Sequence, residues 1–465
     1  MTNKLKFSLL AVVFLLGYSS LSFELIILRQ LINFVGSNTL ITSIVITFIL
    51  MFMSLGYYLG SVINLSKNKL RKLIQKMIVV LSIIFVVASS YYVMEVYFIF
   101  LYFLNIKGFL LPVSLYCLFF IAVPSVFMGF ITSAIGRIIH RYDTNYTGRF
   151  MAVDTFGSVA GSIGTTLVLM PFLSVSATIM VLVGLTSACL LIICHRKEKL
   201  PSLILLIVFL IFCYLLNNEN LINGTNYLIK DDAVSRLEIV PEDVVDNQAQ
   251  SLLMKINGSH SSKISAESSL MFNYIKFIND NFIKTMNDDK IYDILVLGAG
   301  GFTVGIDDTK NNYTFLDIEK KLQTIAEEKF LQKPLSKNKK FVYQDAYLFM
   351  LNDKNKYDLI VVDVFSSVRS IPLNFVTADF FQMVKNHLKN GGVMIANIIT
   401  SPDFKNKFSQ RLDNTMRAVF MHNLSRQVLQ FGNELSNVEY VYYNLPTDNE
   451  IYTLNKSSAM YGQDS

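Results

Sequence analysis

The chain has 465 residues, of which 52% are hydrophobic and 16% are charged, and its formal net charge is +6. This length exceeds what one ordinary core requires, so we expect two domains, and the charged share is low for a soluble protein. All four cysteines lie in apolar segments, which excludes a disulfide framework or a cysteine-based metal site in the second half of the chain. The modest charge requires no acidic partner, and we expect no nucleic acid and no metal.

Apolar residues are concentrated in residues 1–217, where we expect a multi-pass α-helical membrane domain. A helix needs about 20 apolar residues to cross the hydrocarbon layer. Seven segments meet or approach that length, at 8–34, 38–63, 77–104, 109–136, 151–172, 174–194 and 201–217. No clear cleavage site follows the first segment, so it is expected to be a retained helix and not a signal peptide. The sequence therefore predicts a protein of the cell membrane, with the lipid bilayer as a partner.

Basic residues cluster after the second, fourth and sixth of these segments. The positive-inside rule assigns such loops, and with them the N-terminus, to the cytoplasm. Seven crossings would leave the C-terminal half outside, whereas a domain that uses a cytosolic metabolite is expected inside. We expect a cytoplasmic C-terminal domain because cofactor supply is the stronger constraint. The short segment 201–217 would then be the one that does not cross.

Charged and small residues interrupt the apolar segments at two places. Glu24 and Arg29 lie within or at the end of the first segment, where charge marks either function or a buried pair. The alternative is an arginine that reaches the interface and a glutamate that faces other helices. Gly157, Gly161 and Gly164 share one face of the fifth segment, which predicts close packing against another helix.

A change in composition separates the two halves of the chain. Residues 218–230 are polar, contain Asn and Gly, and are expected to be a linker. Residues 231–290 are expected to form a small β-rich cap followed by a helix. Its strands are predicted at 234–241 and 251–257, with a turn at Asn257-Gly258, and the helix is predicted at 268–286.

From residue 291 onward, predicted strands and helices alternate. Strands are expected at 291–298, 313–318, 340–343, 357–363 and 393–398, and two late strands at 427–431 and 439–443. Helices are expected between them at 320–330, 347–351 and 377–389. This alternation predicts an α/β Rossmann-like domain over 291–465, with a parallel, doubly wound sheet and a ligand at the carboxyl ends of its strands.

A glycine-rich turn and an acid follow the first two of these strands. Gly298, Gly300 and Gly301 would let the backbone approach a nucleoside closely. Asp317 comes 17 residues after Gly300, at the end of the second strand, where an acid is placed to bind ribose hydroxyls. The alternatives are a tight turn without a ligand and an aspartate that caps the following helix.

Two further acids follow the third and fourth strands. Asp345 is placed to accept a hydrogen bond from an adenine amino group, or else to cap the helix at 347–351. Asp363 is expected to project into the crevice beside the reacting centre, with a structural loop acid as the alternative. A dehydrogenase that binds a dinucleotide is disfavoured, because the glycine spacing is not G-x-G-x-x-G.

Several motifs between residues 291 and 398 resemble the spermidine synthase (polyamine aminopropyltransferase) family. They are Leu-Gly-Ala-Gly-Gly (297–301), Phe-Leu-Asp-Ile-Glu (315–319), Gln-Asp-Ala (344–346), Tyr-Asp-Leu-Ile-Val-Val-Asp (357–363), Thr-Ala-Asp-Phe-Phe (377–381) and Leu-Lys-Asn-Gly-Gly (388–392). The N-terminal helices resemble the membrane-fused branch of that family. The resemblance implies a domain of the S-adenosylmethionine-methyltransferase type.

The resemblance also implies an activity and roles for residues. The family binds decarboxylated S-adenosylmethionine and moves its aminopropyl group to a diamine. By position, Asp317 matches the acid that binds the ribose, and Asp345, with Ala346 beside it, matches the acid at the adenine. Asp363 matches the acid that helps to deprotonate the attacking amine. The implied partners are a small-molecule amine or other acceptor and a second copy of the chain in a homodimer.

The chain departs from the family in the part of the site that binds the polyamine. Gly301 stands where the family has an acid that holds the aminopropyl amine, and Ser366 replaces a second acid. The family's Tyr and Glu that flank the diamine have no clear match at 271–274. We therefore keep two alternatives open. One is a methyltransferase that uses S-adenosylmethionine itself, and the other is a non-catalytic nucleoside-binding membrane sensor or scaffold.

Overall fold

The computed structural model describes residues 3–36, 39–106, 108–141, 146–218, 220–221, 227–245, 248–265, 271–364, 373–429 and 435–446. Ser366 lies outside these residues. The described chain forms two compact units, one that runs to Ser261 and one that begins at Ser262. Because β4 (Ser259–Ser265) contains this boundary, the two units are joined within a single strand.

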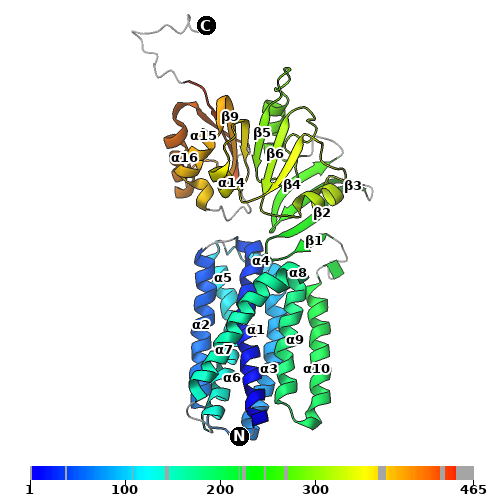
Figure 1. Ribbon diagram of the computed structural model, residues 1–465, viewed down its shortest axis with the longest axis vertical. Coiled ribbons are helices and arrows are strands. Elements are labelled where there is room, and N and C mark those ends of the chain that lie inside the picture. Colours follow the sequence, from blue (N-terminus) through cyan, green and yellow to red (C-terminus); the bar gives the residue numbers. More distant parts are fainter. Residues whose placement is uncertain are drawn as a thin grey trace, which may run out of the picture. The chain divides into compact units, whose positions relative to one another are not determined.

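Long apolar helices that run side by side make up most of the first unit (Figure 1). They are α1 (Asn3–Val35), α2 (Thr39–Val62), α3 (Lys67–Ser89), α6 (Ala122–His140), α7 (Thr147–Ile163), α9 (Val175–Ile193) and α10 (Lys199–Asn217). Shorter helices are α4 (Tyr91–Phe103), α5 (Leu110–Tyr116) and α8 (Met170–Leu173). Within the described residues, seven helical segments are long and apolar enough to cross a membrane, as the sequence predicts.

The third predicted span, 77–104, is wrong in its bounds. The long helix begins ten residues earlier, at Lys67, and ends at Ser89. Its first turns are rich in lysine and arginine, which lowers their hydropathy, although Leu70 and Ile74 on the inner face are buried. Ser90 then starts a separate helix, because its hydroxyl accepts a hydrogen bond from the Val93 amide at 3.4 Å.

The close packing expected of the glycines in α7 is confirmed. A Cβ atom added at Gly157 would lie 2.3 Å from the carbonyl oxygen of Phe14, and one added at Gly161 would lie 2.3 Å from that of Tyr18. Only residues without a side chain allow the backbones of α1 and α7 to approach this closely.

A small antiparallel sheet completes the first unit and extends into the second. Its strands, in order, are β1 (Leu228–Asp231), β2 (Arg236–Val245), β3 (Gln248–Ile256) and β4. The β1 strand begins inside the segment expected to be a linker. Asn257 and Gly258 both have positive φ angles, of 49° and 75°, and they form the predicted turn between β3 and β4.

Arg29 leaves the helix bundle to bind the small sheet. Its guanidinium donates to the Asp232 carbonyl oxygen at 2.6 Å and to the Asp231 carboxylate at 3.0 Å. Arg236 binds the other oxygen of Asp231 at 3.1 Å, and all three charged side chains are buried. Arg29 is therefore part of a buried ion pair, which is one of the alternatives that the sequence left open.

Seven strands form the sheet of the second unit. They are β5 (Asp293–Leu297), β6 (Asn312–Asp317), β7 (Lys339–Tyr343), β8 (Tyr357–Val362), β9 (Leu388–Thr400), β10 (Leu424–Val428) and β11 (Ser436–Tyr443). Their order is β10-β11-β9-β8-β5-β6-β7. Strands β5 to β9 are parallel, but β11 is antiparallel to both β9 and β10. The expectation of a wholly parallel sheet is thus wrong, because the connection between Val428 and Ser436 is too short for a crossover.

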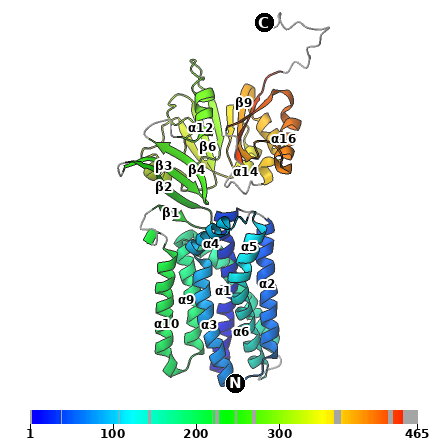
Figure 2. The same ribbon diagram turned by 180° about the vertical axis from the view of Figure 1, so that it is seen from behind.

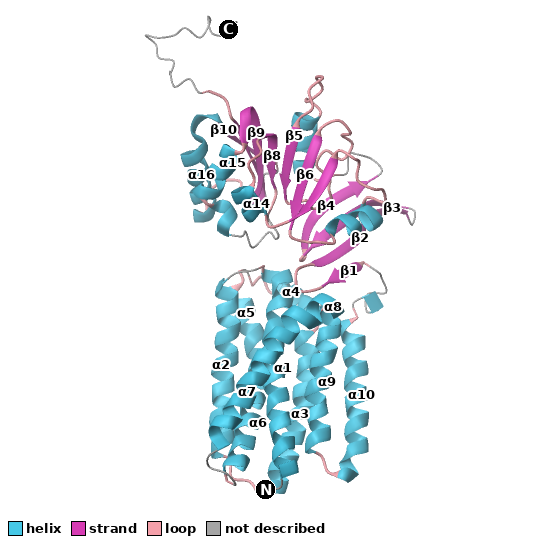
Figure 3. Cartoon of the chain, in the orientation of Figure 1, coloured by secondary structure: helices cyan, strands magenta, loops and turns pink. Residues whose placement is uncertain are grey.

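Helices cover both faces of this sheet. One face packs against α14 (Ala346–Asn352), α15 (Ala378–Asn386) and α16 (Lys407–Phe420), which lie together beside β9 in Figure 3. Helix α12 (Asn273–Ile278) lies on the other side of the sheet, as the reverse view in Figure 2 illustrates, and continues as a π turn over Asn279–Ile283. The predicted helix at 320–330 is shorter, with α13 at Leu322–Ile325 and a π turn to Phe330, and α16 was not predicted.

Candidate active site

The glycine turn after β5 brings three strand ends together. Gly298 has a φ angle of +92°, and a Cβ atom there would lie 2.1 Å from the Asp363 carbonyl oxygen. The Gly298 amide donates to the carbonyl of Leu316 at 3.0 Å, and the Asp363 amide donates to that of Leu297 at 2.8 Å. A residue without a side chain is therefore required at 298, and it holds the end of β8 against the turn.

The turn leaves no room for an acid at position 301. A Cβ atom on Gly301 would lie 2.4 Å from the Phe330 ring and 2.8 Å from Cβ of Ser262. The Gly301 amide donates to the Ser262 hydroxyl at 2.8 Å, while Gly300 has a φ angle of +48°. A close contact between backbone and neighbouring side chains therefore occupies the place where the resemblance implies an acid.

Asp317 ends β6 and supports the glycine turn. Its carboxylate accepts hydrogen bonds from the Ala299 amide at 3.3 Å and from the Glu319 amide at 3.0 Å. Burial raises the pKa of Asp317 to about 6. It does not cap the following helix, because the residue before the first turn of α13 is Lys321.

Asp345 follows β7 and caps helix α14. Its Oδ1 atom accepts a hydrogen bond from the Leu348 amide at 2.9 Å, and Ala346 is the buried first residue of the helix. The capping alternative that the sequence left open is therefore realised, with one carboxylate oxygen.

Asp363 follows β8 and is held by two side chains from other elements. Its Oδ2 atom accepts a hydrogen bond from the Tyr274 hydroxyl at 2.9 Å, and its Oδ1 atom accepts one from the Asn397 amide group at 3.0 Å. Burial raises the pKa of Asp363 to about 6. The pKa of Tyr274 is raised well above its usual value by burial and by the Asp363 charge, so the hydroxyl remains a donor.

Glu439 is a fourth acid at this place, and we did not expect it. It lies on β11 directly opposite Asn397, with no exposed surface. Neither of its carboxylate oxygens has a hydrogen-bond partner among the described residues. Burial, and then the charge of Asp363, raise the pKa of Glu439 well above its usual value. A single acid among the apolar and aromatic residues of 438–443 was the signal that could have identified it.

The strand register explains how the predicted acids come to one edge of the sheet. Leu297 pairs with both Val362 and Leu316, and Asp317 pairs with Tyr343, so these strand ends are level. The acids that follow β6, β7 and β8 therefore lie at the same carboxyl edge as the glycine turn. Tyr274 and Asn397, which the sequence analysis missed, come from α12 and β9. No cluster of three potential metal ligands occurs among the described residues.

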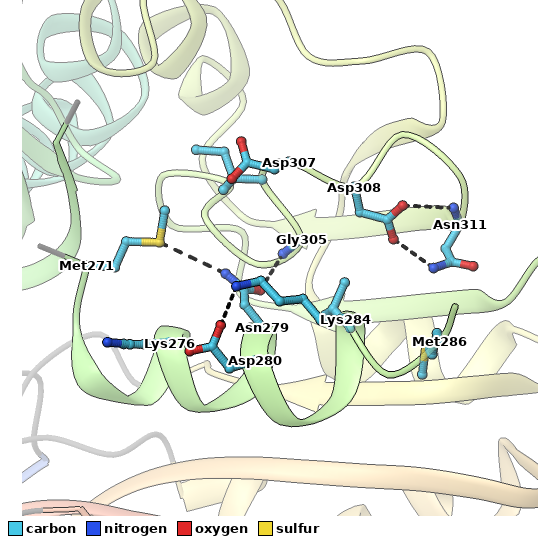
Figure 4. Close-up of a pocket in the computed structure, with 12 residues that line it drawn as sticks. Met271, Lys276, Asn279, Asp280, Lys284, Met286, Gly305, Asp307, Asp308 and Asn311 are labelled. Atoms are coloured by element: carbon cyan, nitrogen blue, oxygen red, sulfur yellow. Dashed lines mark hydrogen bonds and ion pairs between the residues drawn. The ribbon is translucent and has the colours of Figure 1, made fainter. Parts of the chain in front are cut away.

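A cavity of about 500 Å³ lies elsewhere in the second unit (Figure 4). It is lined by α12, by the π turn after it, and by residues 305–311, which precede β6, so none of the predicted site residues lines it. Three of its charged groups have partners within the lining. The Lys284 ammonium contacts Asp280 at 2.6 Å, and Asp308 accepts a hydrogen bond from the Asn311 side chain at 2.7 Å. This cavity therefore shares no lining residue with the predicted site.

Comparison with known proteins agrees with this geometry. Residues 284–445 match the spermine/spermidine synthase domain. A probable polyamine aminopropyl transferase of Bifidobacterium longum is 30% identical over 129 residues, 27% of this chain and 28% of that protein. A polyamine aminopropyltransferase of Sulfurisphaera tokodaii is 33% identical over 140 residues, 27% of this chain and 44% of that protein.

Both matches span less than half of the length of these curated relatives. Among solved structures, a probable spermidine synthase from Corynebacterium glutamicum ATCC 13032 is 22% identical, with a TM-score of 0.39. That alignment covers 49% of this chain and 82% of the other.

Proposed function

We propose that the second unit transfers an aminopropyl group from decarboxylated S-adenosylmethionine to an amine acceptor. One observation carries the proposal. Asp363 stands at the carboxyl edge beside the glycine turn, held by Tyr274 and Asn397, with its pKa raised to about 6. A carboxylate with this pKa is ionised at neutral pH but takes a proton more readily than an ordinary aspartate, which suits a general base.

The chemistry needs a free amine and correct alignment. A protonated amine has no lone pair, so Asp363 first accepts a proton from the acceptor ammonium. The amine nitrogen then forms a bond to the aminopropyl carbon, and the bond from that carbon to sulfur breaks with its electron pair going to sulfur. The sulfonium becomes a neutral thioether, so the step needs positioning more than it needs further charge.

The nucleoside is expected to occupy the edge between Gly298 and Asp345. Asp317 supports this role, because an acid at the end of the second strand of such a sheet meets ribose hydroxyls. Asp345 and Ala346 follow the next strand and are proposed to contact the adenine. The helix cap uses only one oxygen of Asp345, and the other is proposed to face the base.

Asp363→Asn tests the base in the full-length protein in detergent. We expect turnover with a diamine to fall by roughly 10²- to 10⁴-fold, since general base catalysis contributes that much. Calorimetric affinity for the nucleoside product should change little. Asp379→Asn, an exposed acid in the first turn of α15, is the control. Normal turnover in the Asp363→Asn protein would refute the assignment.

The crowding at Gly301 supports a second candidate, methyl transfer from S-adenosylmethionine. Without an acid there, the aminopropyl ammonium loses one charged contact, which is worth about 1.5–3 kcal/mol. Calorimetry separates the two, because aminopropyl transfer requires tighter binding of the decarboxylated donor, and methyl transfer requires the reverse. Binding of either donor without turnover over a panel of amines would identify a sensor instead.

We also propose that the seven apolar segments cross a lipid bilayer. The outward surfaces of the helices support this, since they carry large apolar side chains, such as Leu50, Phe156 and Ile204, each more than half exposed. Such a surface is unfavourable in water and favourable in lipid. The segment Arg196–Asn217, which the sequence analysis expected not to cross, has 22 residues and a mean hydropathy of 2.5. We therefore include it among the spans.

The contacts within the first unit support an assignment of sides. Three contacts tie the N-terminus and the basic loops to one end of the bundle. Lys6 lies 3.4 Å from the centre of the Tyr146 ring, Arg71 contacts Glu198 at 3.3 Å, and Arg137 donates to the Ser61 carbonyl at 2.9 Å.

The small sheet lies at the other end of the bundle. Arg29, near the end of α1, binds Asp231, and Figure 1 draws β1 at the end of the bundle opposite the N-terminus. With the basic loops in the cytoplasm, the sheet and the chain that continues from it lie on the other side. This reverses the expectation of a cytoplasmic domain, and it requires the donor to reach that side.

Reporter fusions after Ser465 decide the side. We expect alkaline phosphatase fused there to be active and green fluorescent protein to be dark, with the opposite result for fusions after Arg141. Fluorescence after Ser465 would overturn the seven-span arrangement. Phosphatase activity there would exclude a donor that is confined to the cytoplasm.

A further inference from the structure

Glu439 is a buried acid that the proposed mechanism does not use. It has no exposed surface, and both carboxylate oxygens lack a hydrogen-bond partner among the described residues. An ionised carboxylate in such a place is very costly unless a cation or several donors meet it. A natural protein that keeps this group therefore supplies its partner in some other way, either as a proton or as a ligand.

The position of Glu439 ties it to Asp363. Glu439 pairs across β11 and β9 with Asn397, and two directly opposite residues project on the same face of a sheet. Asn397 donates to Asp363 at 3.0 Å, and its own carbonyl oxygen has no partner among the described residues. The unpartnered oxygens of Glu439 and Asn397 and the carboxylate of Asp363 thus form one polar cluster.

The other described groups that face this cluster bring no positive charge. From α12, Tyr274 donates its hydroxyl to Asp363, and its pKa is raised by burial and by the charges of Asp363 and Glu439. The charge that acts on Glu439 comes from Asp363. Two carboxyl groups, one phenol and one amide therefore meet without a lysine, arginine or histidine acting on Glu439 or Asp363 among the described residues. Close carboxyl groups of this kind cannot both ionise without a cation.

We propose that Glu439 and Asp363 hold one proton between them in the empty site and that an alkylammonium group of the acceptor displaces this proton when it binds. This inference rests on the proposed function and deepens it, because it adds Glu439 to the groups that receive the ammonium of the acceptor. When the ammonium enters, the shared proton leaves to solvent and both carboxylates are ionised. Asp363 then accepts the proton of the attacking nitrogen, while Glu439 keeps its charge.

The proposal also accounts for the glycine at position 301. The family's acid at this position is absent, and Phe330 and Ser262 fill the space. A carboxylate that arrives from β11 restores negative charge to the site from the opposite side of Asp363. Neutral acceptors, such as alcohols, would not displace the proton and would leave the carboxyl pair without a counter-charge.

Glu439→Gln tests the shared proton without any need for turnover. In the full-length protein at neutral pH, infrared spectroscopy should detect the carbonyl stretch of a protonated carboxyl group, and the variant should lose it. Asp358→Asn is the matched control, because Asp358 is also buried but lies between Lys290 and Lys389 at 2.7 and 2.8 Å. An unchanged band in the Glu439→Gln protein would overturn the shared proton.

A second measurement addresses the acceptor. Calorimetry with 1,4-diaminobutane in two buffers of different ionisation enthalpy should detect proton release by the unmodified protein and none by Glu439→Gln. If the protein turns over the diamine, the KM for the diamine should rise roughly 10- to 100-fold in Glu439→Gln. The affinity of this variant for 5′-methylthioadenosine should be unchanged. Proton release without formation of product would contradict the proposed aminopropyl transfer, but it would leave the shared proton intact. Equal release by both proteins would overturn the role of Glu439.

Discussion

Two buried carboxyl groups in this chain meet opposite surroundings. Asp231, in the first unit, lies between Arg29 and Arg236, and each guanidinium binds one of its oxygens. Glu439, in the second unit, is also buried but has no donor among the described residues, and the charge that acts on it is that of another acid, Asp363. The first carboxylate is saturated by the protein itself, while the second is not.

The difference between these two acids separates a buried charge that stabilises a structural junction from a buried acid that is available to bind a ligand. A buried ion that is fully paired fixes the place where an element attaches, here the small sheet on α1, although replacing the whole cluster by apolar groups often costs little. A buried acid without a partner lowers stability, and perturbed acids of this kind concentrate at functional sites.

Asp231→Ala tests the fully paired carboxylate, and it has the largest expected effect on stability. Removing the carboxylate leaves two buried arginines without a counter-charge, so the free energy of unfolding should fall by about 3–5 kcal/mol. Pulse proteolysis in detergent would measure it, with Asp403→Ala, in an exposed pair, as the control. The triple change Arg29→Met, Asp231→Leu and Arg236→Met should recover most of the loss. A stable Asp231→Ala protein would show that the cluster contributes nothing.

The pH dependence of stability sharpens the other side of the comparison. Burial raises the folded pKa of Asp317 to about 6. A carboxyl group whose pKa is raised by folding contributes its full stabilisation of the folded state below its unfolded pKa. This contribution is lost as the pH rises through the folded pKa. We therefore expect the free energy of unfolding to fall between pH 4 and pH 6, by about 3 kcal/mol from this group. Asp363, with the same pKa, adds to the fall.

Two variants test the sign of this dependence by chemical denaturation over a pH series. Glu439→Gln removes an acid with a raised pKa, so it should gain stability relative to the unmodified protein at the alkaline end. Against the effect of its burial, Lys290 and Lys389 lower the pKa of Asp358, so Asp358→Asn should lose stability above the unfolded pKa instead. The same direction in both variants would contradict the assignment.

A pair of glycine variants asks whether Asp363 is positioned by the turn. Gly298 and Gly391 both have positive φ angles, of +92° and +78°, but only Gly298 faces a backbone atom, while nothing lies within 4 Å of a Cβ at Gly391. Gly391→Ala should cost about 1–2 kcal/mol through its backbone conformation alone. Gly298→Ala should cost about 2 kcal/mol more, and turnover should fall. Equal unfolding temperatures would show that the strand ends move apart freely.

Asp345, which has a protein donor on one carboxylate oxygen, gives the smallest expected effect. Asp345→Ala removes the cap of α14 and should lower the free energy of unfolding by about 1 kcal/mol, whereas Asp345→Asn keeps a capping oxygen and should preserve stability. If Asp345 also contacts the adenine, calorimetry should detect weaker nucleoside binding by Asp345→Ala. Unchanged affinity would leave Asp345 a helix cap alone.

Local patterns were enough to predict much of this molecule. The seven apolar segments, the turn at Asn257-Gly258 and the acids after successive strands were all predicted, because each depends on neighbours along the chain. The antiparallel β11 was not predicted as such, since its direction depends on the length of a connection. Tyr274 and Glu439 were missed, because the residues they meet lie tens of positions away.

Hydropathy and strand periodicity determined by themselves that the chain has a helical part suited to lipid and a sheet with a glycine turn and three acids at one edge. Only the tertiary structure decided which buried charges are paired. Arg29 binds Asp231, which lies 202 positions away in the chain, and Glu439 is brought under the charge of Asp363 by the order of the strands. The physical reason is that the energy of a buried charge depends on what surrounds it in space, and the chain alone does not specify those surroundings.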